Sequence, residues 1–455
     1  MFAPFFSRYA DRPCLRDGAR ILTYGETLAL GRSIVAGIPN RRSLVILRCT
    51  LTADCVAAYL ALLDAGHVPL LLETDLAVEL MDQLAQLYRV DAIVDPFGGI
   101  ELRSGGSILH PELALLLTTS GSTGSPKLVR LSQRAVLANA QAIAEALALD
   151  ADERPLLHLP MSYSYGLSVI HSHLVTGGCI GLTRRSVMEP GYFEDLIAHQ
   201  ATSISGVPFH YAALRRLLAK IEAPSLRTLT QAGGRLDPKL VTFFARWAAD
   251  TGRRFIVMYG QTEAGPRIAA LPPERALDAP EAIGLPIPDV KVHLVDERGD
   301  PVADGEAGEM IVESPGVMMG YANAPSDLAL GDVLHNRLAT GDIATRGTDG
   351  LLRIVGRRAR LLKIFGLRVN VDEVEQRLAD EGHRVICFGE DDCLRVAVEE
   401  GGEAHIVRKR IIDLFTLPPR GVEVRSVHPI ARSASGKIDA ASRDRAWEQA
   451  GPPSG

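Results

Sequence analysis

Strand-like and helix-like segments alternate through most of the chain, and this alternation limits the possible fold more than any other feature. Residues 43–48 and 68–72 are short apolar runs typical of strands. Residues 53–65 and 76–88 have the length and pattern of helices. Such alternation predicts an α/β fold with mainly parallel sheets.

The pattern changes after residue 283, where short strands are separated by turns. Residues 291–296 and 309–313 read as strands, and residues 297–300 between them read as a turn. Closely spaced strands joined by turns pair antiparallel. We therefore expect a small β subdomain within the larger N-terminal part of the chain.

A second change follows Gly356, where a basic run leads into a small α/β pattern. The sequence predicts a helix at 371–379, in which Val374 and Leu378 share one apolar face. We expect a large N-terminal domain over residues 1–355. A small mobile C-terminal domain over residues 356–455 would then carry a hinge at its start.

Composition excludes several classes of protein. A chain of 455 residues with 47% apolar and 23% charged residues is typical of a globular enzyme with two or more domains. A formal net charge of −6 argues against a nucleic-acid binder. No apolar run approaches the roughly 18 residues of a membrane span, and we expect no membrane partner. Six scattered cysteines without CxxC spacing indicate a reducing cytoplasm.

Residues 117–131 form the most informative stretch, because glycines, hydroxyl groups and one lysine are concentrated there. Apolar residues precede the stretch and a helical pattern follows from residue 132, so we expect a loop between a strand and a helix. Backbone N–H groups, hydroxyls and an ammonium group suit a polyphosphate. The spacing is not that of Walker A, because Pro126 precedes Lys127. The candidate phosphate ligands are Thr118, Thr119, Ser120, Gly121, Ser122, Thr123, Gly124 and Lys127.

Three further stretches contain residues that could bind a ligand or act in catalysis. Each stretch taken alone is also typical of an ordinary turn. An apolar run ends at Tyr259 and is followed by Gly260, Thr262 and Glu263, where a carboxylate on a strand-end loop suits Mg²⁺. Asp342 follows a glycine and could accept hydrogen bonds from a ribose. Lys437 lies in a glycine-containing turn near the end of the sequence.

Taken in order, these motifs resemble those of the adenylate-forming superfamily, which includes acyl-CoA synthetases, peptide-synthetase adenylation domains and luciferases. The resemblance runs from about residue 20 to residue 445. Residues 231–236 resemble the adenine wall of that family, and Gly356 with Arg357 resembles its hinge region. Gly366 resembles a residue of its second-step loop, and Lys437 resembles its terminal catalytic lysine.

The resemblance implies binding of ATP and Mg²⁺. Lys127 and the neighbouring hydroxyls would hold the β- and γ-phosphates, Glu263 would bind the metal, and Thr262 would contact the α-phosphate. Lys437 would bridge the substrate carboxylate and the α-phosphate. The residues implied to bind the nucleoside are Gly233, Gly234, Arg235, Tyr259, Gly260, Asp342 and Arg357.

The resemblance also implies a second step, in which a pantetheine thiol passes Gly366. The chain departs from the family pattern at the hinge, where Ala359 replaces the usual Asp. It departs again where Tyr163 stands at a position usually given to His, with Tyr165 close by; one of the two tyrosines reads equally well as core packing. No acidic residue occurs at 159–167, which disfavours an α-amino acid. We expect an apolar or aromatic acid, because no buried charge is evident there.

The sequence therefore predicts an ATP-dependent ligase that activates a carboxylic acid as an acyl-adenylate and transfers it to coenzyme A. One alternative is an acyl-AMP ligase that loads the phosphopantetheine arm of an acyl carrier protein. An alternative of another class is a catalytically inactive nucleotide-binding protein. The joint presence of Lys127, Glu263, Asp342 and Lys437 argues against the last.

Overall fold

The computed structural model describes residues 1–97, 99–118, 127–217, 222–365, 367–399, 404–430, 438 and 440–450. The chain divides into two compact units. The first contains most residues up to Val292 together with Val312–Leu338. The second contains His293–Ile311 and the chain from Ala339 onward.

The largest sheet of the first unit has nine strands in the order β15-β14-β13-β12-β11-β9-β10-β1-β2. Its six strands from β13 to β1 are parallel, whereas β2, β14 and β15 pair antiparallel with their neighbours. The strands are β1 (Pro13–Asp17), β2 (Arg20–Thr23), β9 (Pro155–Leu157), β10 (Ile180–Leu182), β11 (Ser203–Gly206), β12 (Thr228–Gln231), β13 (Arg254–Tyr259), β14 (Ala269–Ala270) and β15 (Leu285–Pro286).

The second sheet has seven strands in the order β18-β8-β7-β4-β3-β5-β6. The strands β7, β4, β3 and β5 are parallel, and the other pairings are antiparallel. The strands are β3 (Leu44–Cys49), β4 (Val68–Glu73), β5 (Ala92–Asp95), β6 (Gly99–Leu102), β7 (Leu113–Thr118), β8 (Leu128–Ser132) and β18 (Gly320–Ala322). Both large sheets are thus mixed, and the expected α/β fold with a parallel core is confirmed.

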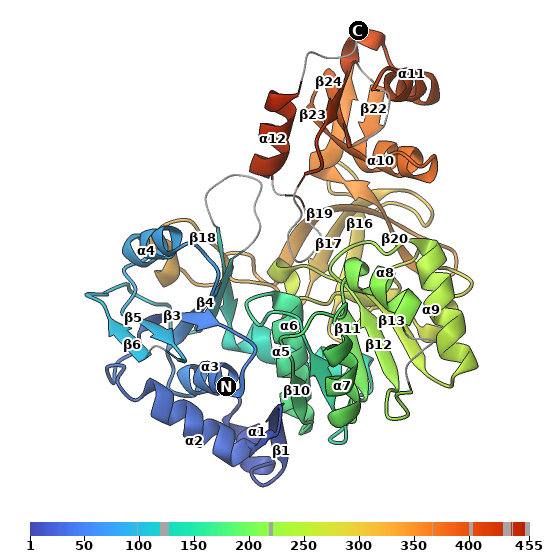
Figure 1. The fold of residues 1–455 in the computed structure, drawn as a ribbon. Coiled ribbons are helices and arrows are strands. Elements are labelled where there is room, and N and C mark those ends of the chain that lie inside the picture. The colour runs from blue at the N-terminus through green and yellow to red at the C-terminus, as the bar shows by residue number, and fades with distance from the viewer. Residues whose placement is uncertain are drawn as a thin grey trace. The chain divides into compact units, whose positions relative to one another are not determined.

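Helices pack on these sheets (Figure 1). Helix α5 contacts β7 and β8, α6 contacts β9, and the two helices contact each other, so this pair links the two sheets. The helices of the unit are α1 (Ala3–Arg8), α2 (Tyr24–Val35), α3 (Ala53–Asp64), α4 (Val78–Leu87), α5 (Gln133–Ala146), α6 (Ser164–Thr176), α7 (Pro190–Ala198), α8 (Pro208–Leu217) and α9 (Pro238–Asp250), with 3-10 helices η2 (Thr262–Ala264), η3 (Pro273–Arg275) and η4 (Pro325–Ala329).

Local sequence explains where several helices begin. The Thr52 side chain accepts a hydrogen bond from the backbone of Cys55 at the start of α3, and Ser132 accepts one from Ala135 at the start of α5. Such caps satisfy backbone donors that the first turn leaves free. Helix α3 is buried on nearly all sides, which explains its almost entirely apolar sequence.

One expectation of the sequence is wrong. Residues 128–132 form strand β8, which pairs antiparallel with β7 so that Thr118 faces Leu128. The hydroxyl-rich loop therefore joins two strands, and the expected helix α5 begins only after β8. The apolar run at 128–131 is short and merges with the helical pattern that follows, which hides the strand.

The second unit contains a four-stranded sheet in the order β16-β17-β19-β20 and a three-stranded sheet in the order β23-β24-β25. Its strands are β16 (Lys291–Val295), β17 (Gly308–Glu313), β19 (Arg337–Arg346), β20 (Leu352–Arg357), β21 (Leu361–Ile364), β22 (Leu367–Asn370), β23 (Val385–Glu390), β24 (Cys393–Glu399) and β25 (Val422–Val427). Its helices are α10 (Val371–Asp380), α11 (Ala404–Phe415) and α12 (Ala440–Gln449), with 3-10 helices η5 (Arg358–Arg360) and η6 (Pro419–Gly421). Val374 and Leu378 are buried, as the apolar face predicted for α10 requires.

Candidate functional site

The topology of the nine-stranded sheet brings three predicted motifs to one edge. Strands β9, β12 and β13 are parallel, so their carboxyl ends lie at the same edge of the sheet. The chain leaves these ends toward Tyr163, Gly233 and Tyr259 respectively. Ligands of parallel α/β sheets bind at this edge.

The turn after β13 is tight because Gly260 has no side chain. A Cβ atom on Gly260 would lie 2.2 Å from the carbonyl oxygen of Pro266. The chain therefore folds back at once, and the Ile268 amide donates to the Tyr259 carbonyl at 2.7 Å. Only glycine permits such an approach of two backbone segments. The turn presents Thr262 and Glu263 on helix η2.

Glu263 accepts a hydrogen bond from a tyrosine that no sequence motif indicated. The Tyr321 hydroxyl donates to Oε1 of Glu263 at 2.8 Å. Lys127 Nζ lies 5.6 Å from the centroid of the Tyr321 ring. Burial, and secondarily the Glu263 charge, raise the pKa of Tyr321 well above its ordinary value, so the phenol stays protonated and remains a donor. The arrangement places a carboxylate and an ammonium group on either side of one aromatic residue.

Strand pairing explains this meeting of distant residues. Tyr321 on β18 pairs with Val129 on β8, and Lys127 directly precedes β8. The Met318 amide donates to the Glu263 carbonyl at 2.9 Å, which fixes η2 against the chain leading into β18. The Gly-Tyr pair that contains Tyr321 is not a motif by itself, so the sequence did not indicate its contact with Glu263. That contact depends on strand register.

The Glu263 carboxylate fits a hard cation. Oxygen ligands suit Mg²⁺, which usually keeps several waters and binds one or two carboxylates together with substrate phosphates. Within the described residues, no group of three or more His, Cys, Asp or Glu side chains could hold a metal ion alone. Glu263 therefore suits a metal that arrives with a polyphosphate.

Replacing Tyr321 by Phe should lower the affinity for Mg²⁺ about threefold to tenfold, because loss of one hydrogen bond to a charged group costs about 1 kcal/mol. The phenyl ring keeps its contact with Lys127. Replacing Tyr321 by Leu should be more harmful, since it removes the ring as well. Magnesium titrations of nucleotide binding for both variants would check this order, and equal effects would show that the hydroxyl does not position Glu263.

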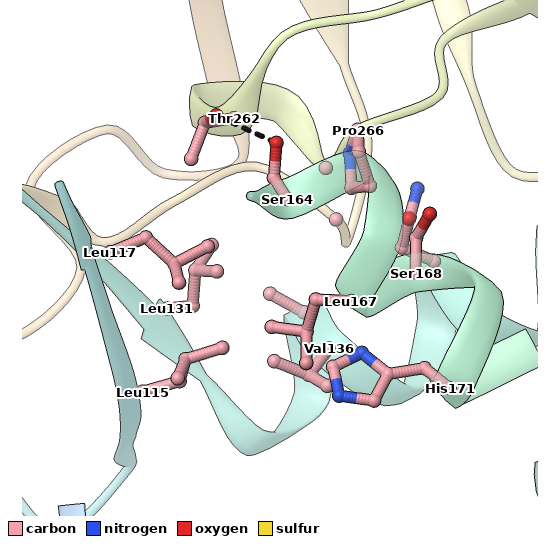
Figure 2. A pocket seen from close by; sticks show the side chains of 14 residues that line it. Leu115, Leu117, Leu131, Val136, Ser164, Leu167, Ser168, His171, Thr262 and Pro266 are labelled. Carbon is pink, nitrogen blue, oxygen red and sulfur yellow. Dashed lines mark hydrogen bonds between the residues drawn. The ribbon is translucent and has the colours of Figure 1, made fainter. Parts of the chain in front are cut away.

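Thr262 forms part of an apolar pocket in the first unit. Its hydroxyl is 2.8 Å from that of Ser164 on the first turn of α6. Figure 2 shows this hydrogen bond beside a space bounded by leucines of β7 and β8 and by Leu167 and His171 of α6. Ser168 and Pro266 lie on another side of the space. Ser164, Ser168 and Thr262 place hydroxyl groups in a lining that is otherwise mostly apolar.

The two predicted pocket tyrosines differ in environment. The Tyr165 hydroxyl is bonded to Thr230 of β12, 2.9 Å from its carbonyl oxygen, and the residue is only 2% exposed. Tyr163 is half-buried, and burial raises its pKa to about 12. A Cβ atom on Gly233, where φ is +81°, would lie 2.4 Å from the Tyr163 hydroxyl. Tyr163 thus borders the predicted adenine wall, whereas Tyr165 packs in the core.

The remaining residues of that wall are less enclosed. Gly234 and Arg235 are exposed, and the Gln231 side chain donates to the Gly234 carbonyl at 2.9 Å. This hydrogen bond joins the last residue of β12 to the loop that follows the strand.

The second unit brings together two residues predicted to contact the ribose. Arg357 Nε donates to Oδ1 of Asp342 at 2.9 Å, because the two residues face each other across β19 and β20. The Asp342 side chain is 5% exposed and that of Arg357 is 66% exposed. A buried carboxylate oriented by a cation suits hydrogen bonds to sugar hydroxyls.

Several predicted residues lie outside the described part of the chain. These are Thr119, Ser120, Gly121, Ser122, Thr123, Gly124, Gly366 and Lys437. The hinge position Ala359 lies in η5, and only its backbone is described. The roles of all these residues remain predictions.

The sequence is similar to those of known proteins. Residues 105–322 match the family model described as AMP-binding enzyme. A long-chain-fatty-acid–CoA ligase of Salmonella typhimurium is 29% identical over 67% of this chain and 54% of its own. A feruloyl-CoA synthase of an Amycolatopsis species is 30% identical over 59% of this chain and 54% of its own. The part of the chain over residues 105–322 is therefore similar to AMP-binding enzymes.

The fold also matches that of a solved CoA synthetase. The o-succinylbenzoate CoA synthetase of Bacillus subtilis, in complex with an acyl-adenylate intermediate, has a TM-score of 0.82 at 20% identity. The match covers 100% of this chain and 98% of that one. The same enzyme has been solved with ATP and magnesium ion. The chain spans about half the length of the curated relatives described above.

None of the helices described is long and apolar enough to cross a membrane. The six cysteines, all within the described residues, are free thiols.

Proposed function

We propose that the protein is an ATP-dependent acid–thiol ligase that forms an acyl-CoA. In the first step a carboxylate oxygen attacks the α-phosphate of ATP, giving an acyl-adenylate and pyrophosphate. In the second step a thiol attacks the acyl carbon, giving a thioester and AMP. Adenylation is needed because oxide is a poor leaving group, whereas AMP is a good one.

The observation that carries this proposal is the arrangement of Lys127, Tyr321 and Glu263. Lys127 lies over the Tyr321 ring and Glu263 accepts from the Tyr321 hydroxyl. A cation and a carboxylate that could bind a metal, both beside one tyrosine, suit transfer at a polyphosphate. Lys127 and residues 118–124 would hold the β- and γ-phosphates, and Thr262 would contact the α-phosphate. Mg²⁺ bound at Glu263 would neutralise phosphate charge during the attack.

We propose one set of residues for the ribose and another for the adenine. Asp342, oriented by Arg357, would accept hydrogen bonds from the ribose hydroxyls. Tyr259, Gly260 and the wall at 233–235 would enclose the adenine. These roles follow from the family resemblance together with the local geometry of each unit.

The second step would require the C-terminal residues to reorient. We propose that Lys437 acts in adenylation and then withdraws, and that the thiol passes Gly366, where a side chain would obstruct it. The domain boundary near Gly356 belongs to this proposal. The free cysteines support a reducing compartment, and we propose the cytoplasm.

The proposal is tested by pyrophosphate release on adding ATP, Mg²⁺ and a panel of carboxylic acids. We expect release with at least one acid and thioester formation when coenzyme A is added. Thioester formation only with a phosphopantetheine-bearing carrier protein would favour the carrier-loading alternative. Nucleotide binding without pyrophosphate release from any acid would indicate an inactive nucleotide-binding protein.

A further inference from the structure

Arg267 is a buried cation without an anionic partner. The residue is 1% exposed and lies between the glutamate-bearing turn and β14. Within the described part of the chain it forms no ion pair, and its Nε atom is buried without a hydrogen-bond partner. An arginine remains charged at neutral pH, and an isolated buried charge costs several kcal/mol.

The groups around Arg267 compensate only part of this cost. Its guanidinium stacks on Tyr165, 4.3 Å from the ring centroid, and Nη1 donates to the Ser168 hydroxyl. Burial lowers the pKa of Arg267, although Tyr165 and Tyr163 oppose the lowering. Burial also lowers the pKa of His173 to about 4, and the Arg267 charge adds to this effect, so His173 is neutral. Among the described residues, no carboxylate forms an ion pair with the Arg267 guanidinium.

Arg267 lies next to the pocket beside Thr262. Ser168, which accepts its hydrogen bond, lines the pocket, and so does the preceding residue, Pro266. Figure 2 shows Ser168 and Pro266 on one side of the space, with Thr262 at another part of its edge. An acid whose reacting carboxylate lies at Thr262 could therefore extend toward Ser168 and the charge behind it.

We propose that Arg267 recognises a second anionic group on the acid, so that the substrate is a dicarboxylate or an acid of similar charge. This inference rests on the proposed ligase function and narrows its substrate class. It replaces the sequence-based preference for an uncharged acid, which assumed that no buried charge lies near Tyr163 and Tyr165. The anionic group pairs with Arg267 and relieves the cost of its burial.

The test compares each diacid with its half-amide, which has nearly the same shape but lacks the second charge. Suitable pairs are succinate and succinamate, glutarate and glutaramate, adipate and adipamate, and terephthalate and 4-carbamoylbenzoate. A site built for a charged hydrogen-bonding group discriminates strongly against an analogue without it. We expect pyrophosphate release from one diacid to exceed that from its half-amide by about 100-fold in kcat/KM.

Substitutions of Arg267 test whether this residue causes the preference for a diacid over its half-amide. Arg267→Met should reduce the preference to less than about tenfold, and Arg267→Lys should retain part of it. Arg254→Met is the control, because Arg254 begins β13, the strand that leads into the turn before Arg267, but its side chain bonds to Leu147 and Thr228. It should leave the ratio unchanged. Equal use of diacid and half-amide by the unmodified protein at every length would overturn the inference, whatever the variants do.

A binding measurement separates this inference from the proposed function. Thermal unfolding is followed with each diacid or half-amide and without ATP. If no acid releases pyrophosphate, the ligase proposal fails. Stabilisation by a diacid that is absent with its half-amide and lost in Arg267→Met would then still support an anion site at Arg267. Absence of any such stabilisation would overturn it.

Discussion

Replacing Glu263 by Gln is expected to lower the rate of adenylation by about 100-fold at moderate magnesium concentration. The amide keeps the shape of the side chain and can still accept from Tyr321. It loses the negative charge that a hard cation requires. Because binding of the metal weakens, part of the rate should return at high Mg²⁺. Pyrophosphate release measured across a magnesium titration checks both statements.

Glu274→Gln is the control for this change. Glu274 is exposed on η3 of the same unit, and the substitution removes the same charge. It should leave the magnesium titration unchanged. If the titrations of Glu263→Gln and the unmodified protein coincide, the metal ligand lies elsewhere.

Replacing Lys437 by Ala should lower adenylation by about 1000-fold while sparing thioester formation from a supplied acyl-adenylate. A cation that bridges the attacking carboxylate and the α-phosphate acts mainly on the first transition state. Single-turnover assays of the two half-reactions separate these effects.

Lys409→Ala serves as the comparison, because Lys409 is exposed on α11 of the same unit and has no assigned role. Both half-reactions should proceed at the unmodified rate in this variant. Parallel loss of both half-reactions in Lys437→Ala would assign Lys437 a general structural role and reject the bridging role.

The turn that contains Glu263 shows which features the local sequence predicts and which it does not. The order of Tyr259, Gly260, Thr262 and Glu263 indicates a strand-end turn with a carboxylate, and the structure contains that turn. The partner of the carboxylate, Tyr321, lies 58 residues away in the sequence. Its position depends on the pairing of β18 with β8, and β8 itself was hidden in the apolar run before α5.

The same contrast applies to charge. A carboxylate in a glycine-containing loop is a recognisable sequence motif. Arg267 follows a proline and belongs to no such motif. Whether an arginine is solvated or buried depends on which elements cover it. Here α6 places Tyr165 and Ser168 over the guanidinium. The sequence therefore predicted no buried charge near Tyr163 and Tyr165, whereas the structure places the Arg267 guanidinium over the Tyr165 ring.

The sequence by itself determined the α/β class, the bounds of β3, α3, β4 and α4 to within about two residues, and the order of the nucleotide motifs. These features follow from apolar periodicity, capping residues and turn glycines, which act between near neighbours in the chain. Only the tertiary structure decided that Tyr321 donates to Glu263, that Ser164 bonds to Thr262, and that Arg267 has no counter-ion among the described residues. Such contacts join distant segments, and strand register and helix packing fix them through the burial of the whole core.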